Sequence, residues 1–241
     1  MAGEWKLEGV TVAADGDKKR QLLRGVRATF RPGQITLLVG RNGSGKSTLL
    51  ETMAGLRPLE AGTIAVGENP LWLRRDGRGK LNREAILKVG IAMQHSESQW
   101  FAATVREELL YSLRPYGLKD AEADRRIAAA LSEVGLETSL LERDPWTLSG
   151  GQQRRLSLAC LLACGPEWLL LDEPTAGLDA VGISRLCAAL QAHRAAGRGA
   201  VVATHDLDAL LPLADAVAVI GGGQVREAAA AEAATYASAA P

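Results

Sequence analysis

One segment of the sequence places an apolar run, a glycine-rich turn and a helix-like stretch in a fixed order. The apolar run is Ile35 to Val39, and the helix-like stretch is Leu49 to Ala54. Nine residues connect them and fit the pattern GxxxxGK[ST]: Gly40, Arg41, Asn42, Gly43, Ser44, Gly45, Lys46, Ser47 and Thr48. A chance turn can imitate two glycines, but strand, full spacing, Lys-Ser and helix together predict a phosphate-binding loop.

The residue types in this loop suit a nucleoside triphosphate. Glycines permit backbone conformations in which successive N–H groups face phosphate oxygens, and the following helix start adds the positive end of its dipole. Lys46 supplies a mobile cation, and the Ser47 hydroxyl can ligand a magnesium ion. We therefore predict that the segment binds a nucleoside triphosphate.

The composition is that of a soluble globular protein. The 241 residues are 47% hydrophobic and 23% charged, enough to bury a substantial core. Lysine plus arginine and aspartate plus glutamate both number 28, so overall charge gives no reason to expect nucleic acid or anionic lipid, although a local patch can bind either. No apolar stretch approaches the roughly 18 to 20 residues that span a bilayer, and the first residues lack a secretory signal's apolar core. We expect a cytoplasmic protein.

Short apolar runs alternate with helical periodicities along most of the chain. The expected strands are Lys6 to Val12, Gly25 to Phe30, Ile35 to Val39, Ile64 to Val66, Val89 to Met93, Trp168 to Leu171, Ala200 to Ala203 and Ala216 to Ile220. The first two flank a polar turn, Asp15 to Arg20, and predict an antiparallel pair. The later strands alternate with helices at Gly151 to Ala163 and Ile183 to Ala196, which predicts an α/β fold with a mostly parallel sheet and helices on both faces. Ligands then belong at the carboxyl ends of the strands.

The pattern from Thr104 to Gly135 is helical. Ile127, Leu131 and Val134 fall on one stripe, and Gly135 stands where a helix C-cap is expected. This predicts an inserted helical lobe within roughly residues 100 to 150. The alanine-rich tail, 227–241, either continues as a short helix or frays.

Two groups of residues have both a structural and a functional interpretation. The basic segment Arg74 to Arg83 is expected to be a solvated surface loop, with contact to phospholipid or a partner as the alternative. Cys160, Cys164 and Cys187 are an odd set without CxxC spacing, which indicates neither a disulfide framework nor a structural zinc site. Cys160 and Cys164 can share a helix face and hold a metal, but small packing residues are the favoured interpretation.

The apolar run Leu169 to Leu171 ends in two carboxylates, Asp172 and Glu173. Asp172 can support a magnesium ion, and Glu173 can point at a water attacking the terminal phosphate, as a general base or a polarising acceptor. Paired acids at a strand end are common in solvated turns. The phosphate loop upstream is the reason to favour the functional interpretation here.

Three further polar residues follow expected strands or turns. Gln94 ends the strand from Val89, where its amide can reach the metal or the attacking water. A lone histidine is more often structural, but His205, at a strand's carboxyl end, can hydrogen-bond the terminal phosphate and sense its loss. Asp179 is an ordinary turn residue except for its spacing after Glu173.

A second loop opens a helix at Leu148. It contains Ser149, Gly150, Gly151 and Gln152, whose N–H groups and hydroxyl form a second potential phosphate cradle. Such a turn is usually only a helix cap. A second anion site beside a complete phosphate loop suggests a nucleotide held between two subunits.

Together these residues resemble the nucleotide-binding subunit of ATP-binding cassette transporters over roughly residues 4 to 226, and the LSGGQ element is diagnostic of that family. The resemblance implies a P-loop NTPase core with an N-terminal antiparallel β subdomain and an inserted helical subdomain. It also implies roles: Gly40 to Thr48 as the Walker A loop, Gln94 as the Q-loop glutamine, Leu148 to Gln152 as the signature, Asp172 and Glu173 as the Walker B end, Asp179 in the D-loop and His205 as the switch histidine.

Family members work as head-to-tail dimers with two ATP molecules between them. The resemblance therefore implies ATP and Mg²⁺ as cofactors, with Ser47, Gln94 and Asp172 at the metal, and Ser149 and Gly151 serving the partner's nucleotide. It implies two protein partners: a second ATPase subunit, either identical or paralogous, and an integral membrane transporter subunit. The chain is expected on the cytoplasmic face of the membrane, with no nucleic acid partner.

The stretch from Gln94 to Leu109 resembles the cobalt and energy-coupling-factor branch, which imports vitamins and metal ions. The residues that fit are Gln99, Phe101, Thr104, Val105 and Glu107, whereas Ser96 replaces that branch's proline. Trp100 and Phe101 stand where the family docks a membrane partner's coupling helix, and they are either docking residues or core residues.

The sequence departs from the family at the adenine site. Members stack the base on an aromatic residue near the end of the first strand, where this chain has Ala13 and Ala14. Base contacts are expected instead from the Trp5 neighbourhood or from the Asp15 to Arg20 turn, unless nucleotide preference is relaxed.

Two rival functions share the same loop chemistry. One is a soluble ATPase of this family acting on nucleic acid or cofactor assembly, but the tandem cassettes, coiled-coil insertions or basic arms usual in such proteins are not evident. The other is the ATPase subunit of an exporter, which differs only in its membrane partner.

Overall fold

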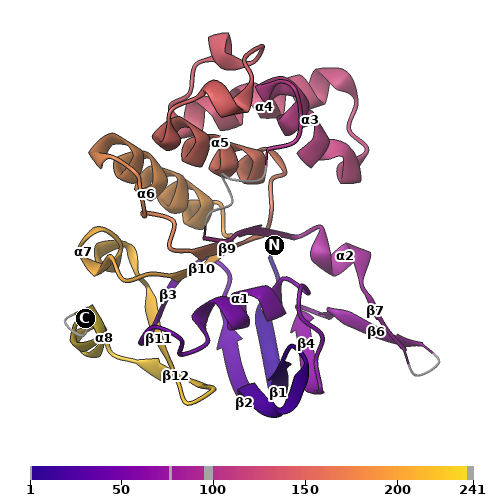
Figure 1. Cartoon of the computed structure of the whole chain (residues 1–241), viewed down its shortest axis with the longest axis vertical. Helices are drawn as coiled ribbons and strands as arrows, with labels where there is room; N and C mark the ends of the chain where they lie inside the picture. Colours follow the sequence, from indigo (N-terminus) through magenta and orange to yellow (C-terminus); the bar gives the residue numbers. More distant parts are fainter. Residues whose placement is uncertain (1, 76–77, 95–99, 238–241) are drawn as a thin grey trace.

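The computed structural model describes residues 2–75, 78–94 and 100–237. Figure 1 shows an antiparallel sheet at the bottom, a larger sheet across the middle and a helical lobe at the top. The strands are β1 (Trp5–Ala14), β2 (Asp17–Phe30), β3 (Ile35–Val39), β4 (Ala61–Val66), β5 (Asn69–Pro70), β6 (Trp72–Arg75), β7 (Arg78–Leu81), β8 (Val89–Ala92), β9 (Trp168–Asp172), β10 (Gly199–Ala203), β11 (Ala216–Gly221) and β12 (Gln224–Ala228). The helices are α1 (Lys46–Met53), α2 (Arg83–Ile86), α3 (Val105–Leu113), α4 (Asp120–Val134), α5 (Gly150–Ala163), α6 (Ala180–Ala195), α7 (Leu207–Leu210) and α8 (Ala230–Ala237).

The middle sheet has the strand order β12-β11-β3-β10-β9-β8, and all its pairs except β11 with β12 are parallel. Each of β3, β9 and β10 is buried along its whole length, as expected of strands covered on both faces. Side chains alternate between the faces: Leu170 packs toward α1, whereas Leu169 and Leu171 pack toward α6 and α7. The predicted parallel sheet is confirmed.

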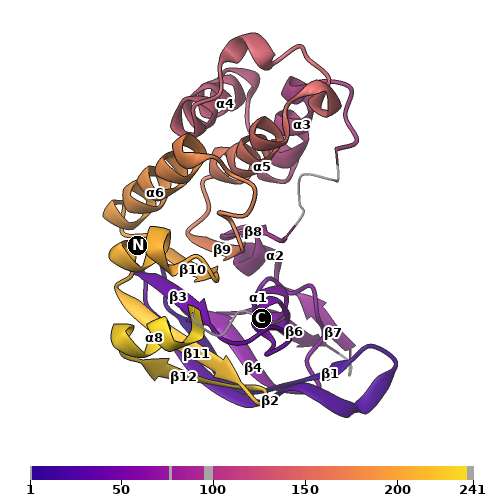
Figure 2. The same cartoon turned by 60° about the vertical axis from the view of Figure 1, so that its left-hand side comes forward.

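Helix α1 lies between the two sheets (Figure 2). Leu49, Leu50 and Met53 are fully buried in a core that both sheets share. The N-terminal sheet has the order β2-β1-β4-β5, and Trp5 pairs with Phe30 across the antiparallel β1–β2 ladder, as predicted. Because α1 directly follows the phosphate loop, this packing fixes the loop between the sheets.

The expected turn at Asp15 to Arg20 is longer than the one that forms. Strand β2 already begins at Asp17, which is paired with Ala14, so only the first two residues of the expected turn connect the strands. Cross-strand pairing therefore overrides the polar character of these residues. Arg20 becomes a strand residue.

The helical lobe is built from α3, α4 and α5 around its own core (Figure 2). The predicted stripe of Ile127, Leu131 and Val134 is buried there, and Gly135 caps α4 in a left-handed conformation with φ 68°. Its N–H donates to the carbonyls of both Leu131 and Ser132, which stabilises the helix end.

The basic segment is not the loop that its charge suggested. Strands β6 and β7 pair as an antiparallel hairpin, with Trp72 opposite Leu81. Asn82 then caps α2 by accepting the N–H of Glu84. The backbone groups of the two strands pair with one another, and charge patterning alone does not reveal such pairing.

At the other end of the chain, the residues of β12 up to Ala228 pair with β11, and α8 follows. A division at residue 226 therefore falls within a strand, and the proposed domain limits stay a prediction. Among the residues described, no helix is both long and apolar enough to cross a bilayer.

Candidate functional site

The phosphate loop takes a conformation that needs its glycines. Gly43 has φ 72° and Gly45 has φ 107°, values that L side chains rarely adopt. Gly40 has no room for a side chain, because a Cβ there would overlap the carbonyl oxygen of Ile220. The loop therefore packs directly on β11.

Lys46 is almost completely buried at the start of α1. Its Nζ donates to the carbonyl oxygen of Gly40 at 2.9 Å. Burial lowers the pKa of Lys46, while the charges of Glu173 and Asp172 act to raise it. The ammonium group thus lies inside the loop, held by the same backbone that is expected to receive phosphates.

The loop also contains a buried polar atom without a partner. Ser44 Oγ has no hydrogen-bond partner among the described residues. A buried hydroxyl left unpaired costs about 1–3 kcal/mol. Together with the glycine-lined backbone, this atom fits a loop that awaits phosphate oxygens.

Two carboxylates reach the same place from β9. Asp172 is 4% exposed, and its neighbour Glu173 has φ 50°, a left-handed value taken by no other non-glycine residue among those described. The Glu173 N–H donates to the carbonyl of Ala203 at 2.8 Å, which holds this conformation at the strand end. Such a conformation usually costs about 1–3 kcal/mol and is typical of functional sites.

Burial raises the pKa of Glu173. The backbone N–H of His205 donates to Glu173 Oε2 at 3.1 Å and lowers the pKa, as do the charges of His205 and Lys46, but desolvation is the largest cause. The carboxylate is therefore more basic than an exposed glutamate. This property suits a group that takes a proton from water.

This shift predicts the pH dependence of activity. Because Glu173 must be deprotonated to act as a base and its folded-state pKa is raised, kcat/KM for Mg·ATP should fall on acidification with an apparent pKa above the ordinary 4.5. Steady-state ATPase assays across the acidic range measure this limb, with circular dichroism at each pH to confirm that the chain stays folded. An acid limb at or below the ordinary value contradicts the assignment.

His205 lies between the lysine and the glutamate. Its Nε2 is 3.2 Å from Lys46 Nζ and 3.3 Å from Glu173 Oε1. One ring nitrogen cannot accept from the lysine and donate to the carboxylate at the same time. Because Lys46 Nζ is a donor, Nε2 accepts from it here, and Glu173 Oε1 has no hydrogen-bond partner among the described residues.

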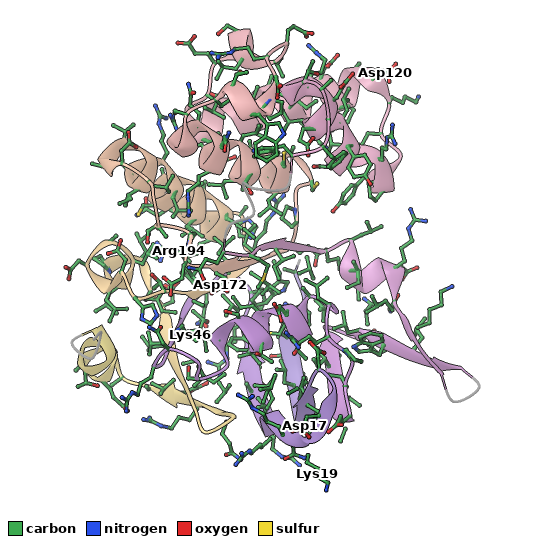
Figure 3. All side chains as sticks on the ribbon, viewed as in Figure 1. Asp17, Lys19, Lys46, Asp120, Asp172 and Arg194 are labelled. Atoms are coloured by element: carbon green, nitrogen blue, oxygen red, sulfur yellow. The ribbon has the colours of Figure 1, made fainter. Side chains whose placement is uncertain are left out.

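These groups line one cleft of about 650 Å³. Figure 3 labels Lys46 at the start of α1 and Asp172 nearby at the end of β9. The predicted residues that line the cleft are Asn42, Gly43, Ser44, Gly45, Lys46, Ser47, Thr48, Gln94, Asp172, Glu173 and His205. Gly40 and Arg41 lie at its base through their carbonyl groups, 2.9 and 3.5 Å from Lys46 Nζ.

The LSGGQ residues lie elsewhere, at the start of α5 in the helical lobe (Figures 1 and 2). Ser149 and Gln152 form a capping box: Ser149 N donates to Gln152 Oε1 at 2.9 Å, and Gln152 N donates to Ser149 Oγ at 3.3 Å. A Cβ at Gly150 or Gly151 would meet no atom within 4 Å. Asp179 is likewise outside the cleft and caps α6 through the N–H of Gly182.

Arg20, the last residue of the turn that was expected to supply base contacts, lines the cleft. Leu22 and Ala176 also line it and were not singled out from the sequence, because no motif marks them and Leu22 reaches the cleft only through the packing of the N-terminal sheet. The other expected source of base contacts was the Trp5 neighbourhood, and Trp5 itself does not line the cleft. It is 0% exposed and packs edge-on against Trp168 at a centroid distance of 6.4 Å.

The two aromatics before the helical lobe have different environments. Trp100 is 9% exposed and belongs to the core of the lobe, whereas Phe101 is 63% exposed. Phe101 packs edge-on against Tyr111 with ring centroids 4.4 Å apart, and both line a surface groove of about 370 Å³. Residues 95–99 of the branch-specific stretch, which include the predicted Gln99 and Ser96, lie outside the described residues.

The cysteines are partly buried packing residues. Cys164 Sγ donates to the carbonyls of Ser112 and Cys160, and burial raises the pKa of Cys160 to about 12. No group of three or more potential ligands (histidine, cysteine, aspartate or glutamate) is close enough to hold a metal in the described parts of the chain. A cysteine metal site is not supported.

Residues 23–176 match the family described as ABC transporter. The chain is 38% identical over 205 residues to the energy-coupling factor transporter ATP-binding protein EcfA2 of Latilactobacillus sakei, covering 84% of this chain and 69% of that one. It is 37% identical over 203 residues to EcfA2 of Streptococcus sanguinis, covering 84% and 72%. The solved structure of cbiO1 from Clostridium perfringens, part of the ABC transporter complex cbiONQ, superposes with a TM-score of 0.78 at 29% identity and covers 98% of this chain and 92% of that chain.

Proposed function

Because this chain belongs to the ABC transporter family, as an ATP-binding subunit of the kind that powers transport by hydrolysing ATP, we propose that it closes as a dimer on Mg·ATP and drives a membrane importer of the energy-coupling-factor type. The cargo class that fits this type is a vitamin or a metal ion. The chain then works as a peripheral subunit on the cytoplasmic face of the membrane.

One observation carries the catalytic part of the proposal. A lysine, a buried aspartate, a strained glutamate and a histidine, contributed by α1, β9 and the loop after β10, all line the phosphate-loop cleft. The unpaired Ser44 Oγ and the room beside Gly43, where a Cβ would meet no atom within 4 Å, support a fit to the phosphates. The residues that would hold Mg²⁺ are Ser47, Asp172 and Gln94, all of which line the cleft. The ion would neutralise phosphate charge.

The chain's own groups then divide the chemistry. Lys46 would pair with phosphate oxygens, and Glu173, with its raised pKa, would take a proton from the attacking water or polarise it. In-line attack needs little more from the protein than positioning and charge stabilisation.

His205 would connect binding to hydrolysis. Its Nε2 is occupied by Lys46 in the structure. When Lys46 turns to a phosphate, Nε2 is released and can donate to the terminal phosphate or to Glu173, 3.3 Å away. The histidine would thus register whether the terminal phosphate is present.

The position of the signature supports a site completed by a second subunit. Ser149 and Gly151 lie at a helix N-terminus in the lobe and do not line this chain's own cleft. A helix start presents backbone N–H groups and the positive end of the helix dipole, which suit a phosphate. We propose that it faces the ATP of the partner, either a second copy or a paralogous ATPase.

The variant Gly151→Asp tests this arrangement. A Cβ at this position would meet no atom within 4 Å, and an acid in the first turn of a helix is favourable, so the melting temperature should not fall. In a closed dimer the added carboxylate would face the partner's phosphates, and turnover should drop by at least about tenfold. ATPase assays and calorimetric Mg·ATP binding at low protein concentration measure turnover and single-subunit binding separately; normal turnover contradicts the proposal.

A mixture of two inactive variants tests composite sites directly. Lys46→Ala lacks a working phosphate loop, and Gly151→Asp lacks a working signature. In a head-to-tail homodimer of one copy of each, one site combines the intact loop of one subunit with the intact signature of the other. Mixing should therefore give ATPase activity well above that of either variant alone. Activity no higher than the sum of the two separate variants argues against a homodimer of this form.

The groove beside Phe101 is the proposed contact for the membrane subunit. Phe101, Tyr111 and Leu110 are exposed apolar residues around it, and the Arg114 guanidinium lies 5.3 Å from the Tyr111 ring centroid. Exposed aromatics with a flanking arginine are typical interface anchors.

Phe101→Ala should weaken capture of the membrane subunit by about 2 kcal/mol, or about 30-fold in Kd. Co-purification in detergent with polytopic subunits encoded beside the gene measures this. Leu56→Ala is the matched control, because Leu56 is 61% exposed but lies outside the groove. Equal recovery with both variants contradicts the docking assignment, and failure of the wild type to co-purify argues for a soluble ATPase.

A further inference from the structure

One end of the cleft is formed by β2. Arg20 and Leu22 both line it, and their spacing of two residues places them on the same face of the strand. The strand lies directly against the phosphate loop, because a Cβ on Gly45 would lie 3.7 Å from the carbonyl oxygen of Leu22. Arg20 is farther from the loop, toward the β1–β2 turn that Asp17 and Lys19 mark in Figure 3.

The cleft has no aromatic wall. None of the described phenylalanine, tyrosine or tryptophan side chains lines it, and the imidazole of His205 lies beside Lys46 and Glu173 at the phosphate end. Trp5 is buried in the core, and Ala13 and Ala14, near the end of β1, carry no ring. Within the described part of the chain, a nucleotide whose phosphates occupy the loop therefore meets no phenylalanine, tyrosine or tryptophan ring on which to stack its base.

Arg20 has the chemistry to replace that ring. It is exposed and, within the described part of the chain, has no hydrogen-bond or ion-pair partner. The nearby Arg57, by contrast, is held by Glu51 and Asp15. A guanidinium group is planar, stays charged and stacks on flat π systems, including nucleic-acid bases.

We propose that Arg20 is the surface on which the nucleotide base stacks, with Leu22 packing against the base or ribose. This inference rests on the proposed ATP site and adds a specificity-determining residue to it. Stacking on a guanidinium uses the π-face that every base has, so it discriminates poorly between bases. The chain should therefore bind the adenine and guanine triphosphates with similar affinity.

Calorimetric titrations with three Mg²⁺-loaded probes test the proposal: AMPPNP, GMPPNP and inorganic tripolyphosphate, which has no base. Arg20→Ala should weaken both nucleotide analogues by about 2- to 30-fold and leave tripolyphosphate unchanged. Arg20→Lys keeps the charge without the plane and should lose nearly as much, whereas Arg20→Tyr should retain binding. Arg24→Ala is the matched control, an exposed arginine of the same strand that does not line the cleft.

The outcomes distinguish failure of the stacking proposal from failure of the proposed ATP site. The stacking role is overturned if Arg20→Ala binds the nucleotide analogues with wild-type affinity. It is also overturned if Arg20→Lys keeps full affinity, or if Arg20→Ala loses as much affinity for tripolyphosphate as for the nucleotides, because either result indicates a phosphate contact. Strong preference of the wild type for AMPPNP over GMPPNP overturns the predicted tolerance. If the wild type binds none of the probes, the ATP site itself is wrong.

Discussion

Replacing Glu173 with glutamine should lower ATP turnover by about 10²- to 10⁴-fold. The amide keeps the size of the side chain and can still accept the backbone N–H of His205, 3.1 Å from Oε2 in the structure. It cannot take a proton from water. Mg·ATP should therefore still bind, and a dimer closed on it should persist because the step that releases it is removed.

Two measurements are needed for this variant. A phosphate-release assay gives turnover, and light scattering coupled to size exclusion, with and without Mg·ATP, gives the oligomeric state. Glu60→Gln is the matched control, since Glu60 is an exposed glutamate outside the cleft. Undiminished hydrolysis in Glu173→Gln would remove the basis for the catalytic assignment.

Lys46→Ala should instead abolish binding at ordinary nucleotide concentrations. Truncating one partner of a buried, hydrogen-bonded charge pair costs about 2–5 kcal/mol, which corresponds to roughly 30- to 5,000-fold in Kd. Lys46 would form such a pair with a phosphate oxygen, because its ammonium group is buried within the loop, where Nζ is 2.9 Å from the Gly40 carbonyl oxygen. Calorimetric titration with Mg·AMPPNP measures the loss.

The control for this variant must address folding, because the lysine is buried. Removing a charge whose pKa burial already lowers should not destabilise the free chain strongly, so thermal unfolding without nucleotide should stay close to the wild type. Nucleotide should then raise the melting temperature of the wild type but not of Lys46→Ala. An equal nucleotide-induced rise in both would show that triphosphate binds elsewhere.

The two variants separate binding from chemistry. Glu173→Gln should bind and not turn over, whereas Lys46→Ala should not bind. The same division appears in the structure: Lys46 contacts the loop backbone, while Glu173 is held by the ends of β9 and β10.

Local signals predicted most of the elements. The burial of β3, β9 and β10 on both faces follows from their continuous apolar runs, and the Gly135 cap follows from a glycine at the end of a periodic stripe. The basic hairpin was missed because charged residues conceal a strand whose pairing partner is only a few residues away. The length of the β1–β2 turn was overestimated for the same reason.

By itself, the sequence determined the phosphate loop and the acidic strand end, because these depend on residue types at fixed spacing along one stretch of chain. Only the tertiary structure decided which distant residues meet. The parallel sheet places His205 within hydrogen-bonding distance of both Lys46 and Glu173. The N-terminal sheet places Arg20 in the lining of the cleft, whereas Trp5 is buried in the core away from it. The physical reason is that strand order and side-chain facing are set by packing across the whole chain, and no local pattern encodes them.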